Sequence, residues 1–176
     1  RGNSIFANTD LGINLGAAGI TANDAILCAG ESVTLTATGG GIYNWNTGET
    51  TAAITVNPTV SGNYSVTVTS AKGCQTIVSK AITVNPKPQP TAINNGPICI
   101  GEKLTLTASG GTIYEWKNVV NTVVSSNETF SIANAVLTDS GIYTVKVTDA
   151  NGCSQTANTE VTVKDKPIAQ ASSNSP

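Results

Sequence analysis

The sequence contains no histidine and no methionine among its 176 residues. Histidine is the usual general base near neutral pH and the commonest metal ligand, so its absence excludes Ser-His and Cys-His catalysis. The chain also lacks a CxxC pair of the kind that holds zinc, and no GKS or GKT sequence follows its glycine-rich stretches. We therefore expect no enzymatic activity, no cofactor and no bound metal ion.

Charge is scarce: 11% of the residues are charged, and nine basic against eleven acidic side chains leave a net charge of −2. Nucleic-acid binding requires a basic surface, so we expect no nucleic-acid partner. No apolar run approaches the roughly 18 residues that span a membrane. No signal peptide is recognisable, which predicts a mature or excised piece of a longer protein. Low charge with abundant Thr, Ser and Asn is common in secreted proteins.

Two blocks of the sequence occur twice, in the same order. Cys28 and Cys99, which begin the two copies of the first block, are 71 residues apart. Cys74 and Cys153, which end the two copies of the second block, are 79 residues apart. The second copy therefore carries eight extra residues between the blocks, which predicts a longer loop or an added edge strand around residues 119–125. The blocks run from Cys28 to Trp45, from Cys99 to Trp116, from Ser61 to Cys74 and from Ser140 to Cys153.

Apolar and polar residues alternate strictly from Ser32 to Thr38, as in a β-strand with one face in water. Gly39, Gly40 and Gly41 follow, and we expect them to form a hairpin turn. Similar alternation recurs along both copies, and no helical period interrupts it. The sequence therefore predicts an all-β fold with two domains.

The repeat positions divide the chain into five parts. Residues 1–20 lie outside the repeat, and their Asn- and Gly-rich steps resemble one coil of a parallel β-helix, although an ordinary irregular lead-in explains them equally well. Three alternating prolines make the central linker a semi-rigid spacer. The C-terminal segment resembles a second linker. We expect a leader at 1–20, domains at 21–85 and 91–166, a linker at 86–90 and a C-terminal linker at 167–176.

Several motifs resemble immunoglobulin-like domains. Trp116 stands where such domains carry the core tryptophan of strand C, and the Asp139-x-Gly141-x-Tyr143 sequence matches the tyrosine corner before strand F. Trp45 and Tyr64 hold the same places in the first copy. The resemblance implies that the two domains are tandem immunoglobulin-like β-sandwiches.

A cysteine before strand B, a tryptophan on strand C and a KGC or NGC sequence after strand F make a more specific combination. This combination resembles the tandem immunoglobulin-like repeats of large secreted surface proteins of Bacteroidota, including gliding and attachment adhesins exported by the type IX system. That resemblance covers residues 28–166. It implies an extracellular location and a stalk or adhesive role, with neighbouring repeats of the same chain and an unknown extracellular ligand or surface as partners.

The four cysteines allow three connectivities. The resemblance favours one bridge in each repeat, Cys28–Cys74 and Cys99–Cys153. Strand direction opposes this pairing, because strands B and F run the same way, so a cysteine before B and one after F lie at opposite ends of a domain. The alternatives are a Cys28–Cys153 bridge between the repeats, with Cys74 and Cys99 left for other repeats of an array, or free thiols.

The rival function is an accessory, carbohydrate-binding module of a secreted polysaccharide-degrading enzyme. Sugar-binding platforms need exposed aromatic side chains, and the chain has two Trp, four Tyr and two Phe. We expect the following aromatic side chains to point inward or to occupy the strand corners: Tyr43, Trp45, Tyr64, Tyr114, Trp116, Phe130 and Tyr143. Few remain for a platform, so we expect a structural or adhesive module, whose exposed edge strands would permit self-association.

Overall fold

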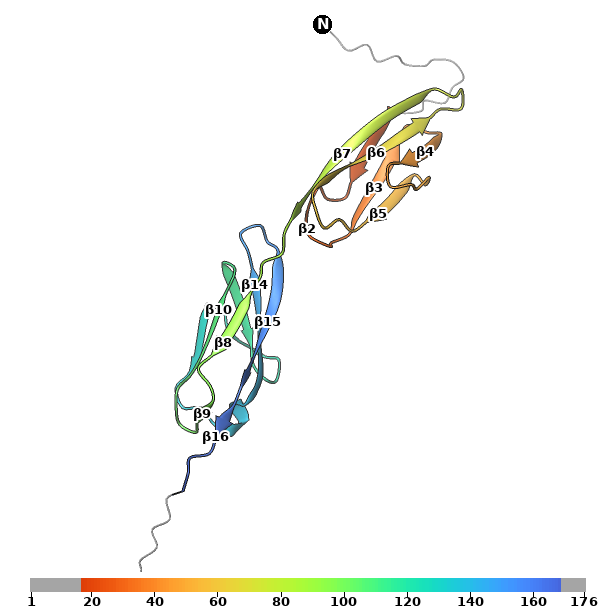
Figure 1. Cartoon of the computed structure of the whole chain (residues 1–176). Helices are drawn as coiled ribbons and strands as arrows, with labels where there is room; N and C mark the ends of the chain where they lie inside the picture. Colours follow the sequence, from red (N-terminus) through yellow and green to blue (C-terminus); the bar gives the residue numbers. More distant parts are fainter. Residues whose placement is uncertain (1–16, 169–176) are drawn as a thin grey trace, which may run out of the picture. The chain divides into compact units, whose positions relative to one another are not determined.

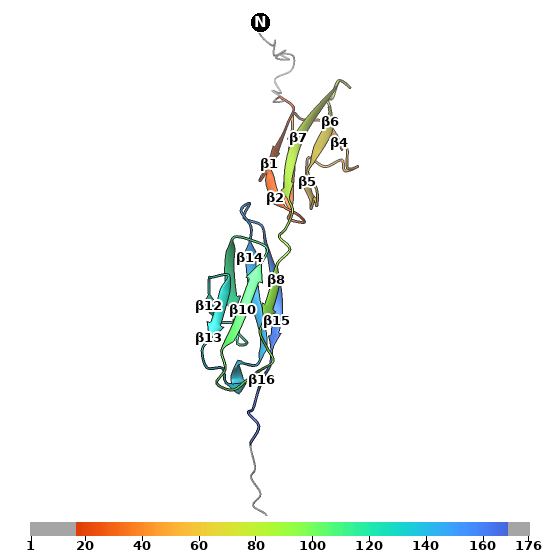
Figure 2. The same cartoon turned by 60° about the vertical axis from the view of Figure 1, so that its left-hand side comes forward.

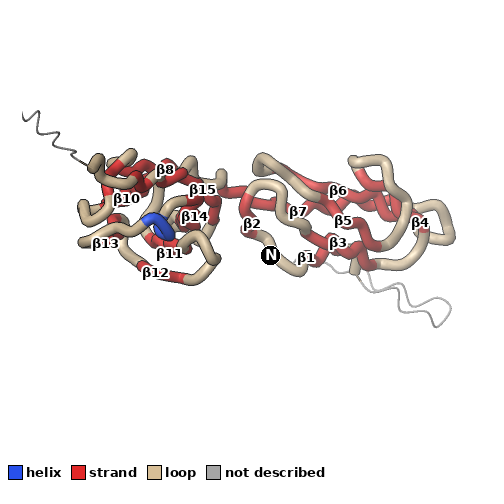
Figure 3. The backbone as a smooth tube through the Cα atoms, turned by 90° about the horizontal axis from the view of Figure 1, so that it is seen from below, coloured by secondary structure: helices blue, strands red, loops and turns tan. Residues whose placement is uncertain are grey.

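The computed structural model describes residues 17–168, which divide into two compact units between Pro86 and Lys87 (Figure 1). Each unit is considered by itself below. Almost all regular structure is β-strand, and the helical segment of the described residues is one short turn, η1 (Leu137–Asp139) (Figure 3). The all-β fold predicted from the sequence is confirmed.

The first unit is a sandwich of two sheets. One sheet has the order β1-β3-β5 and the other the order β2-β7-β6-β4. Neighbouring strands are antiparallel except β2 and β7, which are parallel. The strands are β1 (Gly19–Ala22), β2 (Ile26–Cys28), β3 (Val33–Thr38), β4 (Ile42–Trp45), β5 (Ala53–Val56), β6 (Gly62–Thr69) and β7 (Gln75–Asn85).

The second unit repeats this plan with one added strand, β12, and with two strands, β15 and β16, in place of the single last strand β7. Its sheets have the orders β13-β10-β8 and β12-β11-β14-β15 (Figure 2). The short strands β9 and β16 pair in parallel (Figure 1). The extra strand, β12, pairs with the end of β11, as the eight-residue insertion predicted. The strands are β8 (Thr91–Asn94), β9 (Ile98–Cys99), β10 (Leu104–Ser109), β11 (Ile113–Lys117), β12 (Val123–Ser125), β13 (Thr129–Ile132), β14 (Gly141–Thr148), β15 (Ser154–Val161) and β16 (Val163–Lys164).

The strict alternation of the sequence becomes the two faces of each strand. In β3, Val33, Leu35 and Ala37 are buried, whereas the threonines between them face outward. Each unit has its own apolar core between its sheets, and one tryptophan is buried in each. This arrangement of two packed, mainly antiparallel sheets with a buried tryptophan is the immunoglobulin-like sandwich that the resemblance implied.

The expected leader is shorter than predicted. Strand β1 begins at Gly19 and pairs with β3 along its whole length, from Gly19 opposite Thr38 to Ala22 opposite Leu35. Residues 19 and 20 are therefore part of the first sandwich, because their backbone completes its three-stranded sheet. The proposed β-helix coil falls mainly on residues 1–16, outside the described part of the chain.

The expectation that Gly39, Gly40 and Gly41 form a hairpin turn is wrong. The strands on either side, β3 and β4, belong to different sheets, so the glycines carry the chain across the sandwich. All three have positive φ angles, between 63° and 114°. A Cβ atom at Gly41 would overlap the carbonyl group of Thr69 on β6. The connection is this tight because the two sheets must be joined within three residues.

Replacing Gly41 with alanine should destabilise the first unit well beyond the effect of Gly48→Ala. Both glycines have φ near +100° to +115°, so both substitutions carry the strain of a left-handed residue, about 1–2 kcal/mol. Only Gly41 also meets backbone, whereas Gly48 faces open space. We expect an additional ~1–3 kcal/mol for Gly41→Ala from overpacking, measured by urea unfolding of both variants. Equal losses for the two variants would contradict the close approach.

Candidate functional site: the four cysteines

Cys28 and Cys99 occupy equivalent positions at the ends of short strands. Cys28 ends β2 opposite Asn85, and Cys99 ends β9 opposite Lys164, each in a parallel pair with the last strand of its unit. The backbone N–H of each cysteine donates to a glutamate carboxylate three residues later, at 2.8 Å in both units. The two cysteines therefore share one local conformation, at the end of the unit where the chain leaves it.

Glu31 and Glu102, the glutamates in these contacts, were missed by the sequence reasoning. The signal was present, because a Gly-Glu pair follows both cysteines at the same spacing. The N–H of each glutamate also donates to the carbonyl oxygen of its cysteine, at 3.0 Å. Each Glu thereby closes a tight turn that fixes the cysteine at the strand end.

Cys74 and Cys153 are equivalent as well, and they end the turns before β7 and β15. The N–H of Cys74 donates to Ser70 Oγ at 3.1 Å, and the N–H of Cys153 donates to Asp149 Oδ1 at 2.9 Å. In both turns the first residue's N–H also donates to the cysteine carbonyl, at 2.8 and 2.9 Å. The Asp149 carboxylate thus stabilises a turn.

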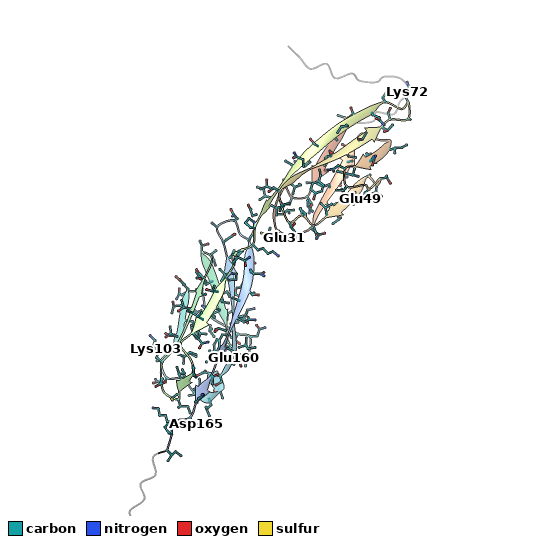
Figure 4. The ribbon with its side chains drawn as sticks, viewed as in Figure 1. Glu31, Glu49, Lys72, Lys103, Glu160 and Asp165 are labelled. Carbon is teal, nitrogen blue, oxygen red and sulfur yellow. The ribbon has the colours of Figure 1, made fainter. Side chains whose placement is uncertain are left out.

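The two cysteines of the first unit lie at opposite ends of its longest strand, β7. Cys74 directly precedes β7, and Cys28 lies beside its last residue, Asn85. A strand of eleven residues spans roughly 33 Å, whereas a disulfide requires Cα atoms within about 7 Å. Figure 4 shows the same separation, since Glu31 and Lys72, neighbours of the two cysteines, label opposite ends of the unit.

The alternative that the resemblance favoured, one bridge within each repeat, is therefore wrong. Cys28 and Cys153 are disulfide-bonded, whereas Cys74 and Cys99 are free thiols. Since Cys74 is free, no Cys28–Cys74 bridge forms, and since Cys99 is free, no Cys99–Cys153 bridge forms. The argument from strand direction gave the physical reason, because one cysteine of each unit lies at the end where the chain leaves the unit and the other lies in a turn at the opposite end.

The aromatic side chains lie in or against the cores. Trp45 and Trp116 are 3% and 0% exposed, and their indole N–H groups donate to the carbonyl oxygens of Thr51 and Glu128. Tyr143 is 1% exposed, whereas Tyr64 is only half-buried. Tyr43, Tyr114 and Phe130 are half-buried and pack against the cores. No aromatic residue is among the large exposed apolar side chains of residues 17–168, so this part of the chain presents no aromatic platform.

Tyr143 has a perturbed acidity. Its burial raises the pKa of the phenol above the ordinary value of 10.0, and the nearby Asp139 carboxylate raises this pKa further. The Tyr143 ring also lies 6.4 Å from that of Phe130, centroid to centroid. The tyrosine at this corner is thus a neutral core residue whose ionised form is disfavoured by the fold.

Above about pH 10 the free energy of unfolding of the second unit should fall more steeply with pH when Tyr143 is present than in a Tyr143→Phe variant. The folded-state pKa is raised, so the stabilising contribution of the neutral phenol is complete below the unfolded pKa of about 10 and is lost as pH rises through the folded value. Chemical unfolding from pH 8 to 11, with Cys74→Ser and Cys99→Ser present in both proteins to prevent disulfide exchange, measures this slope. Parallel profiles would contradict the effect of burial.

Within the described residues, no group of three or more Cys, Asp or Glu side chains is arranged to hold a metal ion. No helix of this part of the chain has the length and apolar character to cross a membrane. The cysteines are therefore the chemically distinctive groups on these two sandwiches.

The strand order, the buried tryptophans and the two sheets of each unit define a protein of immunoglobulin-like β-sandwiches. Residues 87–167, which make up most of the second unit, match the family model described as Ig-like domain, CHU_C associated. This match supports the resemblance to immunoglobulin-like repeats of Bacteroidota-type proteins. No curated protein sequence matches the chain.

Solved structures with a similar fold include the three N-terminal domains of the bacteriophage RB49 outer capsid protein Hoc, with 22% identity and a TM-score of 0.40 over 83% of this chain and 58% of that one. The four N-terminal Ig domains of Dscam1 isoform 6.9 share 16% identity, with a TM-score of 0.37 over 79% and 43% of the two chains. Extracellular domains 3–5 of Drosophila OTK share 17%, with a TM-score of 0.46 over 85% and 63%. The chain thus spans less than two thirds of each of these proteins' chains.

Proposed function

We propose that this chain is a non-catalytic, force-transmitting segment of a stalk in a large extracellular protein of bacterial type. The observation that supports this function most directly is the pattern of bonded and free cysteines. Cys28 lies at the end where the chain leaves the first unit, and Cys153 lies in a turn of the second unit. Both are bonded, whereas their equivalents Cys99 and Cys74 are free.

The partner of Cys28 in this proposal is Cys153. The chain has four cysteines, and two of them are free thiols, so each bonded cysteine has the other as its partner within the chain. The bridge would then join the two units covalently, in addition to the peptide linker. It closes a loop that contains the 124 residues between the two cysteines.

The topology of each unit supports this pairing. In the second unit, Thr91 at the start of β8 pairs with Ser109 at the end of β10, and Thr148 at the end of β14 pairs with Ile113. The turn that ends at Cys153 therefore lies at the end of the second unit where the linker arrives. The six residue steps from Asn85 to Thr91 span at most about 20 Å, so the linker is short enough to permit the proposed bridge.

A covalently joined pair of sandwiches suits the transmission of force and the positioning of other domains. The described residues present no aromatic platform and no metal-binding cluster, in keeping with a connecting role. Extracellular space is oxidising enough to preserve such a bridge, which supports a location outside the cell. The match of residues 87–167 to an Ig-like domain model supports an immunoglobulin-like module. The role as a stalk of a gliding or attachment adhesin is our proposal from the sequence resemblance of residues 28–166.

Affinity electrophoresis through gels that contain soluble polysaccharides separates the stalk from a carbohydrate-binding accessory module. A stalk segment should migrate with the same relative mobility in gels with and without xylan, β-glucan, pectin or chitosan oligomers. Serum albumin serves as the non-binding control. Retardation by one of the polysaccharides, abolished by heat unfolding of the chain, would contradict the stalk and support the accessory module.

A further inference from the structure

We propose that Cys74 and Cys99 each form a disulfide of the Cys28–Cys153 kind with a further immunoglobulin-like module that carries the same cysteine pattern. Cys99 would bond the turn cysteine of a module that follows the second unit. Cys74 would bond the strand-end cysteine of a module that precedes the first unit. This inference rests on the proposed stalk. It extends the Cys28–Cys153 bridge to every pair of consecutive modules in an array.

The first support is that Cys99 reproduces the surroundings of a cysteine that is bonded. Cys28 and Cys99 both lie in parallel strand pairs, opposite Asn85 and Lys164. The backbone N–H groups of the next residues, Ala29 and Ile100, donate to the carbonyl oxygens of Asn85 and Lys164, at 2.9 Å in both units. With the glutamate contacts described above, the equivalence covers the strand, the turn and the cysteine itself. The Cys99 thiol thus stands where the first unit places a bonded sulfur.

The second support comes from the turn cysteines. Cys74 and Cys153 both follow a turn in which a glycine of positive φ, 85° and 84°, precedes the cysteine. The side chain that accepts the cysteine N–H differs, Ser70 in one unit and Asp149 in the other, but the bonding pattern is the same. Cys153 is bonded, and Cys74 is an exposed free thiol at the equivalent place.

The third support is the surface beside Cys99. The N–H of Gly101 donates to the carbonyl oxygen of Ala135 at 2.8 Å, which places the turn after Cys99 against the segment before η1. Val136, at the end of that segment, and Leu137, the first residue of η1, are 48% and 47% exposed. The sequence after the last strand also recurs, because Lys166-Pro167 follows the second unit as Lys87-Pro88 follows the first. Apolar side chains and a thiol thus lie where a following module would be joined.

Bond formation needs a disulfide oxidant, for which oxidised glutathione serves in the test. The Cys99 thiolate attacks one glutathione sulfur, which releases reduced glutathione and leaves a mixed disulfide on Cys99. The thiolate of the partner's turn cysteine then attacks the Cys99 sulfur, forms the inter-module bond and releases the second glutathione. The two protein thiols lose two electrons and two protons, and the glutathione disulfide gains both.

Two single variants of the full chain test this inference, with a second copy of the chain as the partner module. Cys74→Ser retains only the Cys99 thiol, and Cys99→Ser retains only the Cys74 thiol. Each variant is incubated in glutathione redox buffer alone and in an equimolar mixture, one of the two carrying an isotope label. We expect the mixture to contain about ten times or more as much disulfide-linked heterodimer as both homodimers together. A tenfold ratio corresponds to a free-energy preference of ~1.4 kcal/mol for pairing Cys99 with Cys74.

A statistical mixture, with heterodimer about equal to both homodimers together, would overturn the inference, as would an absence of any dimer. A direct fusion of two full chains, with Cys74→Ser in the first copy and Cys99→Ser in the second, raises the effective concentration of the thiols. Failure of its Cys99 to bond Cys74 would overturn the inference too. Peptide mapping of the same samples reports Cys28–Cys153 separately, so failure of the outward bridges is distinguished from failure of the bridge on which the stalk depends.

Discussion

Stretching the oxidised chain from its two ends should release far less length than stretching the reduced chain. With Cys28 bonded to Cys153, force passes across the sulfur atoms, and the 124 residues between the cysteines carry none of it. At 3.3–3.6 Å per extended residue, the bridge should hide about 41–45 nm of contour length. Single-molecule force spectroscopy with and without a reducing agent measures this difference directly.

The matched variants isolate the bridge in this experiment. Cys28→Ser with Cys153→Ser should give the long extension without any reducing agent, and Cys74→Ser with Cys99→Ser should keep the short extension of the oxidised chain. Two full module-unfolding steps in the oxidised chain would contradict a load path through Cys28 and Cys153. If the oxidised chain instead hides the contour length of two separate loops of 45 and 53 residues, each repeat contains its own bridge.

The second large effect is expected at the core tryptophans. Trp116 is completely buried, so Trp116→Ala should lower the free energy of unfolding of the second unit by about 3–5 kcal/mol, through lost transfer energy and the cavity left behind. The carbonyl of Glu128 would keep a partner, since it also accepts from the N–H of Ala108. The loss should therefore come from packing rather than from an orphaned polar group.

The equivalent variant of the first unit, Trp45→Ala, provides the matched control. Each unit contains one tryptophan, so the remaining indole reports the unmutated unit by fluorescence, while circular dichroism reports both. Urea unfolding under reducing conditions should show one weakened transition and one unchanged transition in each variant. A loss below about 1 kcal/mol, or loss of both units together, would contradict two independent cores, because surface substitutions commonly stay within ±0.5 kcal/mol.

The strands and cores could be predicted from the sequence because their signals are local. Alternation in Val33, Leu35 and Ala37 fixes which face is buried, whatever the partner strand is. The eight-residue insertion predicted β12, since an insertion confined to one gap must form a loop or an edge strand. The inward position of Trp45 and Trp116 follows from the same periodicity.

The features that the sequence did not predict depend on non-local pairing. Strand β2 has three residues and pairs in parallel with a strand more than fifty residues later, so no local pattern marks it. Without that pairing, the position of Cys28 beside Asn85 cannot be known. The glycines after β3 look like a hairpin for a similar reason, because only the pairing of β3 with β1 and β5 shows that β4 lies in the other sheet.

The two tyrosine corners illustrate a third limit. Tyr64 and Tyr143 occupy equivalent positions, yet only Tyr143 is fully buried. Phe130 pairs with Leu106 in the second unit, where Ile54 pairs with Leu35 in the first, so the second unit has a larger aromatic side chain near this corner. Packing against neighbours on other strands, rather than the Gly-x-Tyr motif, sets the burial.

The most direct test of the proposed stalk is non-reducing peptide mapping of the 176-residue chain made in an oxidising compartment. Free thiols are first alkylated, and trypsin then places the four cysteines on four different peptides, since lysines 72, 80, 103, 146 and 164 separate them. We expect one crosslinked pair, which joins the peptides of Cys28 and Cys153, and alkylated Cys74 and Cys99. Crosslinks of Cys28 to Cys74 and of Cys99 to Cys153 would contradict the covalent joining of the two units.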